Sequence, residues 1–176
     1  PSAILLQSEG KNQSGSVVTS IWEGTRPLLI EVQALVTESH GDQPRRLVLG
    51  ADGQRLSMLL AIMQKHLGLK LHRYDVFINV VGGIKITETG IDLAIMVAII
   101  SSLTQQTLEQ GVLVFGEVGL SGEVRAVPYG LERIKVAFKQ GFNKAWIPSG
   151  NGSRTNEQHH IFKSVQGLRF LLSRQS

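Results

Sequence analysis

Apolar residues recur along the chain with two different periods, which together predict a mixed α/β architecture. Alternating or β-branched apolar runs predict β-strands at residues 15–22, 28–36, 45–49, 75–81, 112–118, 123–127 and 143–147. Apolar residues at every third or fourth position predict helices at residues 52–68, 91–103, 129–139 and 162–172. A short apolar run at residues 3–6 predicts a further edge strand.

The order of these elements predicts an α+β mixed sandwich, in which helices pack on a largely continuous sheet. A length of 176 residues fits one domain, which we assign to residues 1–176. Apolar residues make up 42% of the chain, which is enough for a core without a disulfide or a metal. The sequence begins with proline, and we expect it to be a piece of a longer protein.

The chain contains no cysteine, which excludes thiol catalysis, disulfide bonds and cysteine-bound zinc. This composition fits a reducing cytoplasm, where we expect the protein to reside. No apolar run reaches the roughly 18 residues that a membrane-spanning helix needs, so we expect no membrane partner. His159 and His160 are predicted in a polar surface loop, with weak metal binding as the alternative.

The net charge of +4 is unevenly distributed. Residues 1–120 hold nine Lys/Arg and eleven Asp/Glu, whereas residues 121–176 hold nine and three. A basic C-terminal third is typical of binding to phosphate backbones or to an acidic partner, and a solvated helix face is the alternative. The candidate phosphate contacts are Arg125, Arg133, Lys135 and Lys139. Aromatic residues that could stack on bases are scarce, so any contact with nucleic acid is expected to be with the backbone and independent of base sequence.

Two sequence features allow a chemical and a structural interpretation. Gly116, Gly119 and Gly122 could form a phosphate loop, but they lack its spacing and its Lys-Ser/Thr pair, so a β-hairpin is the preferred prediction. Glu88 and Asp92 flank Gly90 before the helix at 91–103. We expect these carboxylates to accept backbone N–H groups at the helix start, with a contact to a neighbouring subunit as the alternative.

Three longer segments carry a family resemblance: WEGTRPLLIEVQALV (Trp22–Val36), DVFINVVGGIKITET (Asp75–Thr89) and VFGEVGLSGEVRAVPYGLERI (Val114–Ile134). They resemble the C-terminal domain of the RadA (Sms) family of bacterial DNA repair proteins. That domain is similar to the proteolytic domain of Lon. The resemblance therefore implies the ribosomal protein S5 domain 2-like fold over nearly the whole chain.

The Lon pattern implies that this chain is not an enzyme. When the Lon pattern is laid along TETGIDLAIMVAIISS, its nucleophilic serine falls on Gly90, and its catalytic lysine falls on Leu131. A Ser-Lys dyad needs an oxygen nucleophile and an amine base, which glycine and leucine do not supply. A divergent peptidase that pairs Thr89 with Lys135 is the remaining catalytic alternative.

The resemblance also implies a setting for the domain. A full-length protein of this family is a hexameric, DNA-dependent ATPase that drives branch migration of recombination intermediates in the cytoplasm, at the nucleoid, and it works beside a recombinase. This domain would support assembly of the ring and contact single- or double-stranded DNA. CxxC pairs, a Walker A loop and the KNRFG motif are absent, so ATP, Mg and Zn are expected only in N-terminal parts. A pure oligomerisation scaffold without DNA contact is the alternative.

Overall fold

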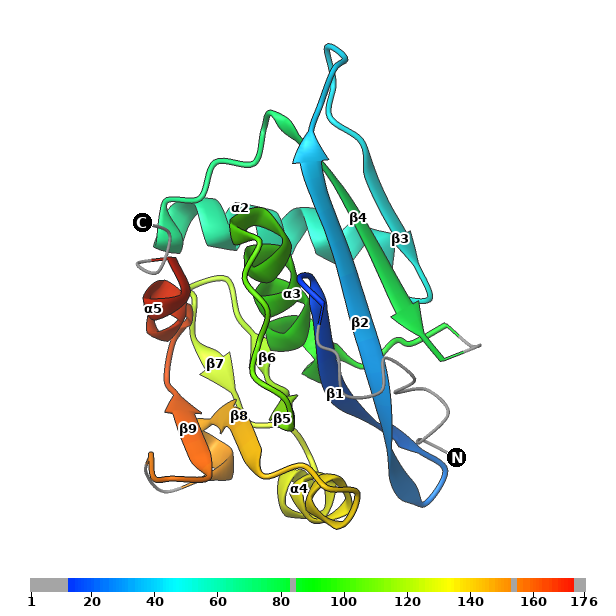
Figure 1. Cartoon of the computed structure of the whole chain (residues 1–176), viewed down its shortest axis with the longest axis vertical. Helices are drawn as coiled ribbons and strands as arrows, with labels where there is room; N and C mark the ends of the chain where they lie inside the picture. Colours follow the sequence, from blue (N-terminus) through cyan, green and yellow to red (C-terminus); the bar gives the residue numbers. More distant parts are fainter. Residues whose placement is uncertain (1–12, 83–84, 153–154, 173–176) are drawn as a thin grey trace.

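The computed structural model describes residues 13–82, 85–152 and 155–172, which form the mixed α/β architecture of Figure 1. The strands are β1 (Ser16–Glu23), β2 (Arg26–Glu38), β3 (Arg46–Leu49), β4 (Tyr74–Val81), β5 (Val112–Val114), β6 (Glu117–Val118), β7 (Val124–Arg125), β8 (Lys144–Pro148) and β9 (His159–Phe162). The helices are α2 (Gly53–Leu67), α3 (Asp92–Thr104), α4 (Gly130–Lys139) and α5 (Arg169–Leu172), with short 3-10 helices at Thr89–Ile91, Ser149–Asn151 and Val165–Leu168.

Seven of these strands form one sheet in the order β3-β4-β2-β1-β5-β8-β9. The pairs β1–β2 and β2–β4 are antiparallel, whereas β3–β4, β1–β5, β5–β8 and β8–β9 are parallel. The strands β6 and β7 form a separate hairpin, which confirms the hairpin prediction for the glycine-containing segment. The sheet is therefore mixed, with its parallel half at the β5-β8-β9 edge.

Helices cover the two faces of the sheet unequally. The larger core cluster joins α2, α3 and α5 to one face of the sheet, and α3 is buried over Asp92–Ser101. Because α3 is apolar all round, this burial confirms its predicted central position. A smaller cluster joins α4 to the opposite face through Ile134 and Ala137, which pack with Leu113 and Phe115.

The outer face of β2, β4 and β3 exposes apolar side chains. Leu35 lies opposite Phe77, which in turn lies opposite Leu47 across the strand register. Leu35, Leu47 and Leu49 are each about half exposed. Neighbouring strand residues that point to the other face, such as Val76 and Ile78, are buried against the helices. The alternation along these strands therefore places apolar residues on both faces.

The structure corrects three of the sequence predictions. The strand predicted at residues 112–118 is two short strands separated by Phe115 and Gly116, and the Gly116 N–H donates to the Gly90 carbonyl instead of to a strand. His159 and His160 lie in β9 rather than in a loop. The helix predicted at residues 162–172 is a 3-10 turn followed by the short α5. The edge strand predicted at residues 3–6 lies outside the described residues.

Gly15 provides a test of how tightly β1 packs on β2. Its φ is +85°, and a Cβ built there would lie 2.2 Å from the Ala34 carbonyl oxygen. Gly24 also has a positive φ, of +63°, but nothing lies within 4 Å of a Cβ there. We predict that Gly15→Ala lowers the free energy of unfolding by about 2 kcal/mol or more, and that Gly24→Ala lowers it by only about 1 kcal/mol. Urea denaturation measures both, and equal losses would contradict the packing argument.

Candidate binding site at the turn before helix α3

A cleft of about 630 Å³ lies beside the turn that precedes α3. It is bounded by the end of β1, the 3-10 turn, β6 and the loop that leads into α4. Its lining residues are Trp22, Thr87, Glu88, Thr89, Gly90, Glu117, Ala126, Val127, Pro128, Tyr129 and Arg133. The cleft therefore contains Gly90, the position at which the Lon pattern has its nucleophile.

Gly90 is buried and has no room for an unhindered side chain. A Cβ at this position would lie 3.0 Å from Val127 Cγ1 and 3.2 Å from Glu88 Oε1. The Gly90 carbonyl accepts a hydrogen bond from Gly116 N, and the Gly116 carbonyl accepts one from Leu93 N. These two bonds connect the turn and the start of α3 to Gly116, which follows β5. Backbone hydrogen bonds therefore fix the position of the turn.

An ion pair between the buried Arg133 and the partly exposed Glu88 joins three elements at the turn. Arg133 is 2% exposed, and its Nη1 lies 2.8 Å from Glu88 Oε1. Arg133 also donates to the carbonyls of Ser20 and Pro128, each at 2.8 Å. Glu88 Oε2 accepts a hydrogen bond from Trp22 N at 2.8 Å. The pair thus connects β1, the turn and the start of α4, and hydrogen bonds satisfy both charged groups.

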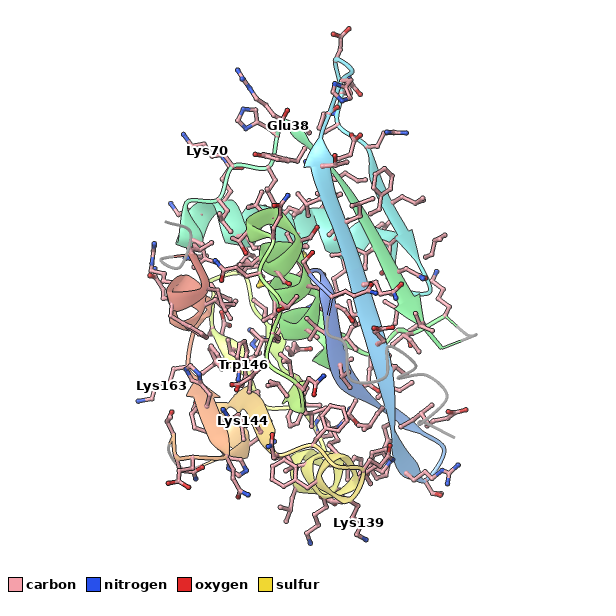
Figure 2. The ribbon with its side chains drawn as sticks, viewed as in Figure 1. Glu38, Lys70, Lys139, Lys144, Trp146 and Lys163 are labelled. Carbon is pink, nitrogen blue, oxygen red and sulfur yellow. The ribbon has the colours of Figure 1, made fainter. Side chains whose placement is uncertain are left out.

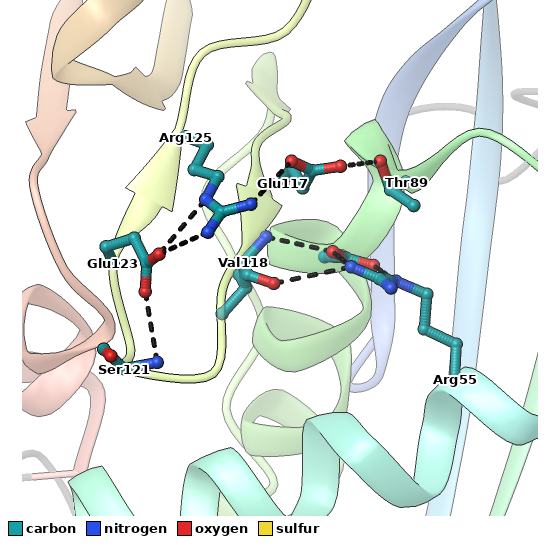
Figure 3. Close-up of polar contacts among 8 residues, drawn as sticks. Arg55, Thr89, Glu117, Val118, Ser121, Glu123 and Arg125 are labelled. Atoms are coloured by element: carbon teal, nitrogen blue, oxygen red, sulfur yellow. Dashed lines mark hydrogen bonds and ion pairs between the residues drawn. The ribbon is translucent and has the colours of Figure 1, made fainter.

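A second buried carboxylate, Asp92, anchors the start of α3. Asp92 is fully buried and accepts two hydrogen bonds from Arg55, at 2.7 and 2.6 Å, and one from Val118 N at 2.9 Å (Figure 3). Burial raises the pKa of Asp92, and the hydrogen bonds from Arg55 and Val118 oppose that rise. Asp92 therefore binds α2 and β6 to α3.

The predicted capping roles of Glu88 and Asp92 need correction. Asp92 accepts its backbone N–H from Val118 on β6, and Glu88 accepts one from Trp22 on β1. Neither side chain makes a cap bond at the start of its own helix. Both carboxylates connect distant elements, because each also pairs with an arginine from another helix.

An exposed polar chain runs along the rim of the cleft. Thr89 Oγ1 donates to Glu117, and Arg125 lies 3.7 Å from Glu117 and 2.7 Å from Glu123 (Figure 3). Hydrogen bonds from its own backbone N–H and from Arg125 lower the pKa of Glu123. Thr89 is thus paired with a carboxylate and not with an amine.

The far wall of the cleft is an aromatic stack that the sequence interpretation did not identify. The rings of Trp22 and Tyr129 are stacked, with centroids 4.1 Å apart and planes at 18°. Tyr129 has a φ of +60°, which is rare for a bulky residue, and it immediately precedes α4. The segment Pro128-Tyr129-Gly130 was the only sequence signal of an unusual backbone there.

The four predicted phosphate contacts do not form one group. Arg125 is on β7 and paired with Glu123, whereas Lys135 and Lys139 are exposed on α4. Arg133 differs from the other three, because its guanidinium is buried and bonded to Glu88 and two carbonyls. Leu131, where the Lon pattern places a lysine, has an exposed side chain.

His160 lies in an aromatic cluster, in contrast to its predicted surface position. Its ring stacks on Phe162 with centroids 4.5 Å apart, and the Trp146 ring lies 5.9 Å away. Burial lowers the pKa of His160.

Among the described residues, no group of three or more His, Asp or Glu side chains could hold a metal ion. No helix among these residues has the length and apolar character needed to cross a membrane.

Removal of Arg133 tests the importance of the buried ion pair. We predict that Arg133→Ala lowers the free energy of unfolding by about 3 kcal/mol or more, because it leaves Glu88 and two carbonyls without their donor. The matched control is Lys135→Ala on the exposed face of the same helix, with an expected change within about 0.5 kcal/mol. Urea denaturation with circular dichroism compares the two, and a small loss for Arg133→Ala would contradict this account.

Comparison with known proteins gives one family match and a set of close relatives. Residues 56–151 match the family model described as subunit ChlI of Mg-chelatase. The chain is homologous to DNA repair protein RadA over most of its length: it is 54% identical to the Pseudomonas aeruginosa protein over 154 residues, which are 88% of this chain and 34% of that protein.

Other relatives with the same name give a consistent picture. The chain is 52% identical to DNA repair protein RadA of Salmonella typhimurium over 98% of this chain and 38% of that protein. It is 42% identical to DNA repair protein RadA of Bacillus subtilis over 86% of this chain and 33% of that protein. The chain thus spans about a third of the length of the curated relatives it matches.

Proposed function

The chain belongs to the family described as subunit ChlI of Mg-chelatase, and from its homology to RadA we propose that it is a non-proteolytic, Lon-like domain of a RadA-type DNA repair protein. In this proposal the domain has the ribosomal protein S5 domain 2-like fold, supports ring assembly and contacts DNA during branch migration. The homology carries the proposal, because the relatives reported above are named for DNA repair and not for chelation.

Absence of proteolysis is supported by the turn before α3. Gly90 supplies no nucleophile, and the cation that lines the cleft is Arg133, which cannot take the place of the lysine base at neutral pH. The alternative pair of Thr89 and Lys135 lacks support, since Thr89 donates to Glu117 and Lys135 is on the exposed surface of α4. We propose that this cleft retains the shape of a peptidase site and has lost its chemistry.

DNA contact is supported by Lys135 and Lys139. They are four residues apart on α4 and therefore share one helical face, and both are exposed. Within the described residues neither makes an ion pair. Figure 2 labels Lys139 at the free end of the molecule formed by α4. Unpaired, exposed ammonium groups contact phosphates without base specificity.

A charge-reversal pair tests this contact. We predict that Lys135→Glu with Lys139→Glu weakens binding to labelled single- and double-stranded DNA by at least about tenfold at low salt, and lowers the salt slope by about 2. Fluorescence anisotropy over a salt series measures both quantities.

The matched control reverses Lys65 and Lys70, which are exposed at the end of α2 and just beyond it, and changes the net charge equally. If the control lost as much DNA affinity, the effect would be due to the net charge of the domain and not to a contact at α4. Unchanged binding in the first variant, or no binding by the parent domain, would favour the scaffold alternative.

Ring assembly is supported by the outer sheet face described above. Leu35, Phe77 and Leu47 form a row across β2, β4 and β3, and Leu49 extends it. Exposed, contiguous apolar side chains on a sheet face are typical of protein contacts. The ATPase, with ATP and Mg, and a zinc site belong in this proposal to the part of the relatives that this chain does not span, and so do contacts with a recombinase.

Leu47 tests whether this face takes part in self-association. We predict that Leu47→Lys shifts the domain towards the monomer in analytical ultracentrifugation and leaves its urea midpoint nearly unchanged, because the side chain is exposed in one copy. Leu120→Lys, at an even more exposed leucine in the β6–β7 turn, is the control and should leave the oligomeric state unaltered. Identical behaviour of both variants would remove this face from the proposed assembly.

A further inference from the structure

A second cavity, of about 480 Å³, lies at the C-terminal end of α3, the end opposite the turn at Gly90. It is formed by the last turn of α3, residues 106–109, β8, residues 155–160 and α5. Its size lies within the usual range for small-molecule sites. We call it the Trp146 pocket.

One wall of the Trp146 pocket is formed by three aromatic rings that pack against one another. The Trp146 ring lies 5.9 Å from His160 and 5.5 Å from Phe170, and His160 lies 5.2 Å from Phe170. Burial lowers the pKa of His160, so its imidazole is neutral at neutral pH. The wall is therefore aromatic and uncharged, and Trp146, which is 8% exposed, forms its inner part.

The rest of the pocket is polar but almost neutral. Asn156 Oδ1 accepts hydrogen bonds from the backbone N–H groups of Gln158 and His159, which leaves the amide N–H groups of Asn156 available. The side-chain amides of Gln106 and Gln158 make no hydrogen bond within the described residues. These groups supply both donors and acceptors to whatever fills the cavity.

Charged residues at the rim limit the charge of the ligand that the pocket can bind. Lys144 lines the pocket and is paired with Glu109 at 2.8 Å, and Glu157 adds a further negative charge. This balance disfavours a phosphate inside the cavity. Figure 2 labels Lys144 and Trp146 on β8 and Lys163 just after β9, so positive charge is present at the same edge of the sheet.

We propose that the Trp146 pocket takes one unstacked nucleobase of a single DNA strand, with the adjoining phosphates outside it near Lys144 and Lys163. The inference rests on the proposed DNA contact and names a site for it. Bases of single strands stack on aromatic side chains and hydrogen-bond through their edges. An apolar peptide side chain would satisfy the aromatic wall but leave the amide groups unpaired, which is costly when they are covered.

The test uses Trp146 as its own reporter. The chain has two tryptophans, so Trp22→Phe leaves Trp146 as the only one. In this background we expect oligodeoxythymidylate to quench Trp146 fluorescence, and an abasic strand of equal length and charge to leave it unchanged. Adding Thr107→Phe, which fills the cavity mouth, should abolish the quenching and weaken binding of the base-containing strand by about tenfold. Thr37→Phe, at an exposed position on β2, is the matched control and should do neither.

Anisotropy on the same samples separates failure of this inference from failure of the proposed function. A strand that binds without quenching, or an abasic strand that quenches equally, would overturn the nucleobase assignment and leave DNA contact intact. Quenching by a phenylalanine-containing peptide and not by the strand would assign the pocket to a protein partner. No anisotropy change with any strand would reject the proposed DNA contact, and the inference with it.

Discussion

The ion pair between the buried Arg133 and Glu88 is the constraint on which the candidate site depends. Its four hydrogen bonds connect the end of β1, the turn before α3 and the start of α4, which come from distant parts of the sequence. Removing Glu88 would leave the buried guanidinium of Arg133 without its counter-ion, whereas removing Arg133 would leave the partly exposed carboxylate of Glu88 without it. This ion pair therefore helps to fix the turn, the cleft beside it and the packing of α4 on the sheet.

This arrangement explains how the turn at Gly90 keeps its shape without a side chain at that position. The shape of the turn is set by backbone hydrogen bonds from Gly116 to Gly90 and from Leu93 to Gly116, and none of these requires a side chain at position 90. The guanidinium of Arg133 lines the same cleft as Gly90. It is permanently charged, and its N–H groups already donate to Glu88, Ser20 and Pro128. The exposed lysines of α4 face away from this connection, so the site and the proposed DNA surface can change independently.

Local pattern predicted the elements whose stability is local. The β-branched runs gave β1 and β2, and Asp52 with Gly68 marked both ends of α2. β9 was missed because its two histidines continue the polar segment before it, and because it is stabilised by parallel pairing with β8 rather than by alternation. The role of Arg133 was also missed, because its burial depends on Glu88, 45 residues away, and on the Ser20 carbonyl, 113 residues away. Contacts between residues so far apart in the sequence cannot be predicted from the local spacing of residue types.

A double-mutant cycle between Glu88 and Arg133 tests the central claim most directly. The free energy of unfolding is measured for Glu88→Gln, for Arg133→Met, for both together and for the parent chain. The account predicts a coupling energy of about 1–3 kcal/mol, with the double variant more stable than the sum of the single losses implies. A coupling energy near zero would contradict it, because the two side chains would then stabilise the fold separately and the turn would not depend on their contact.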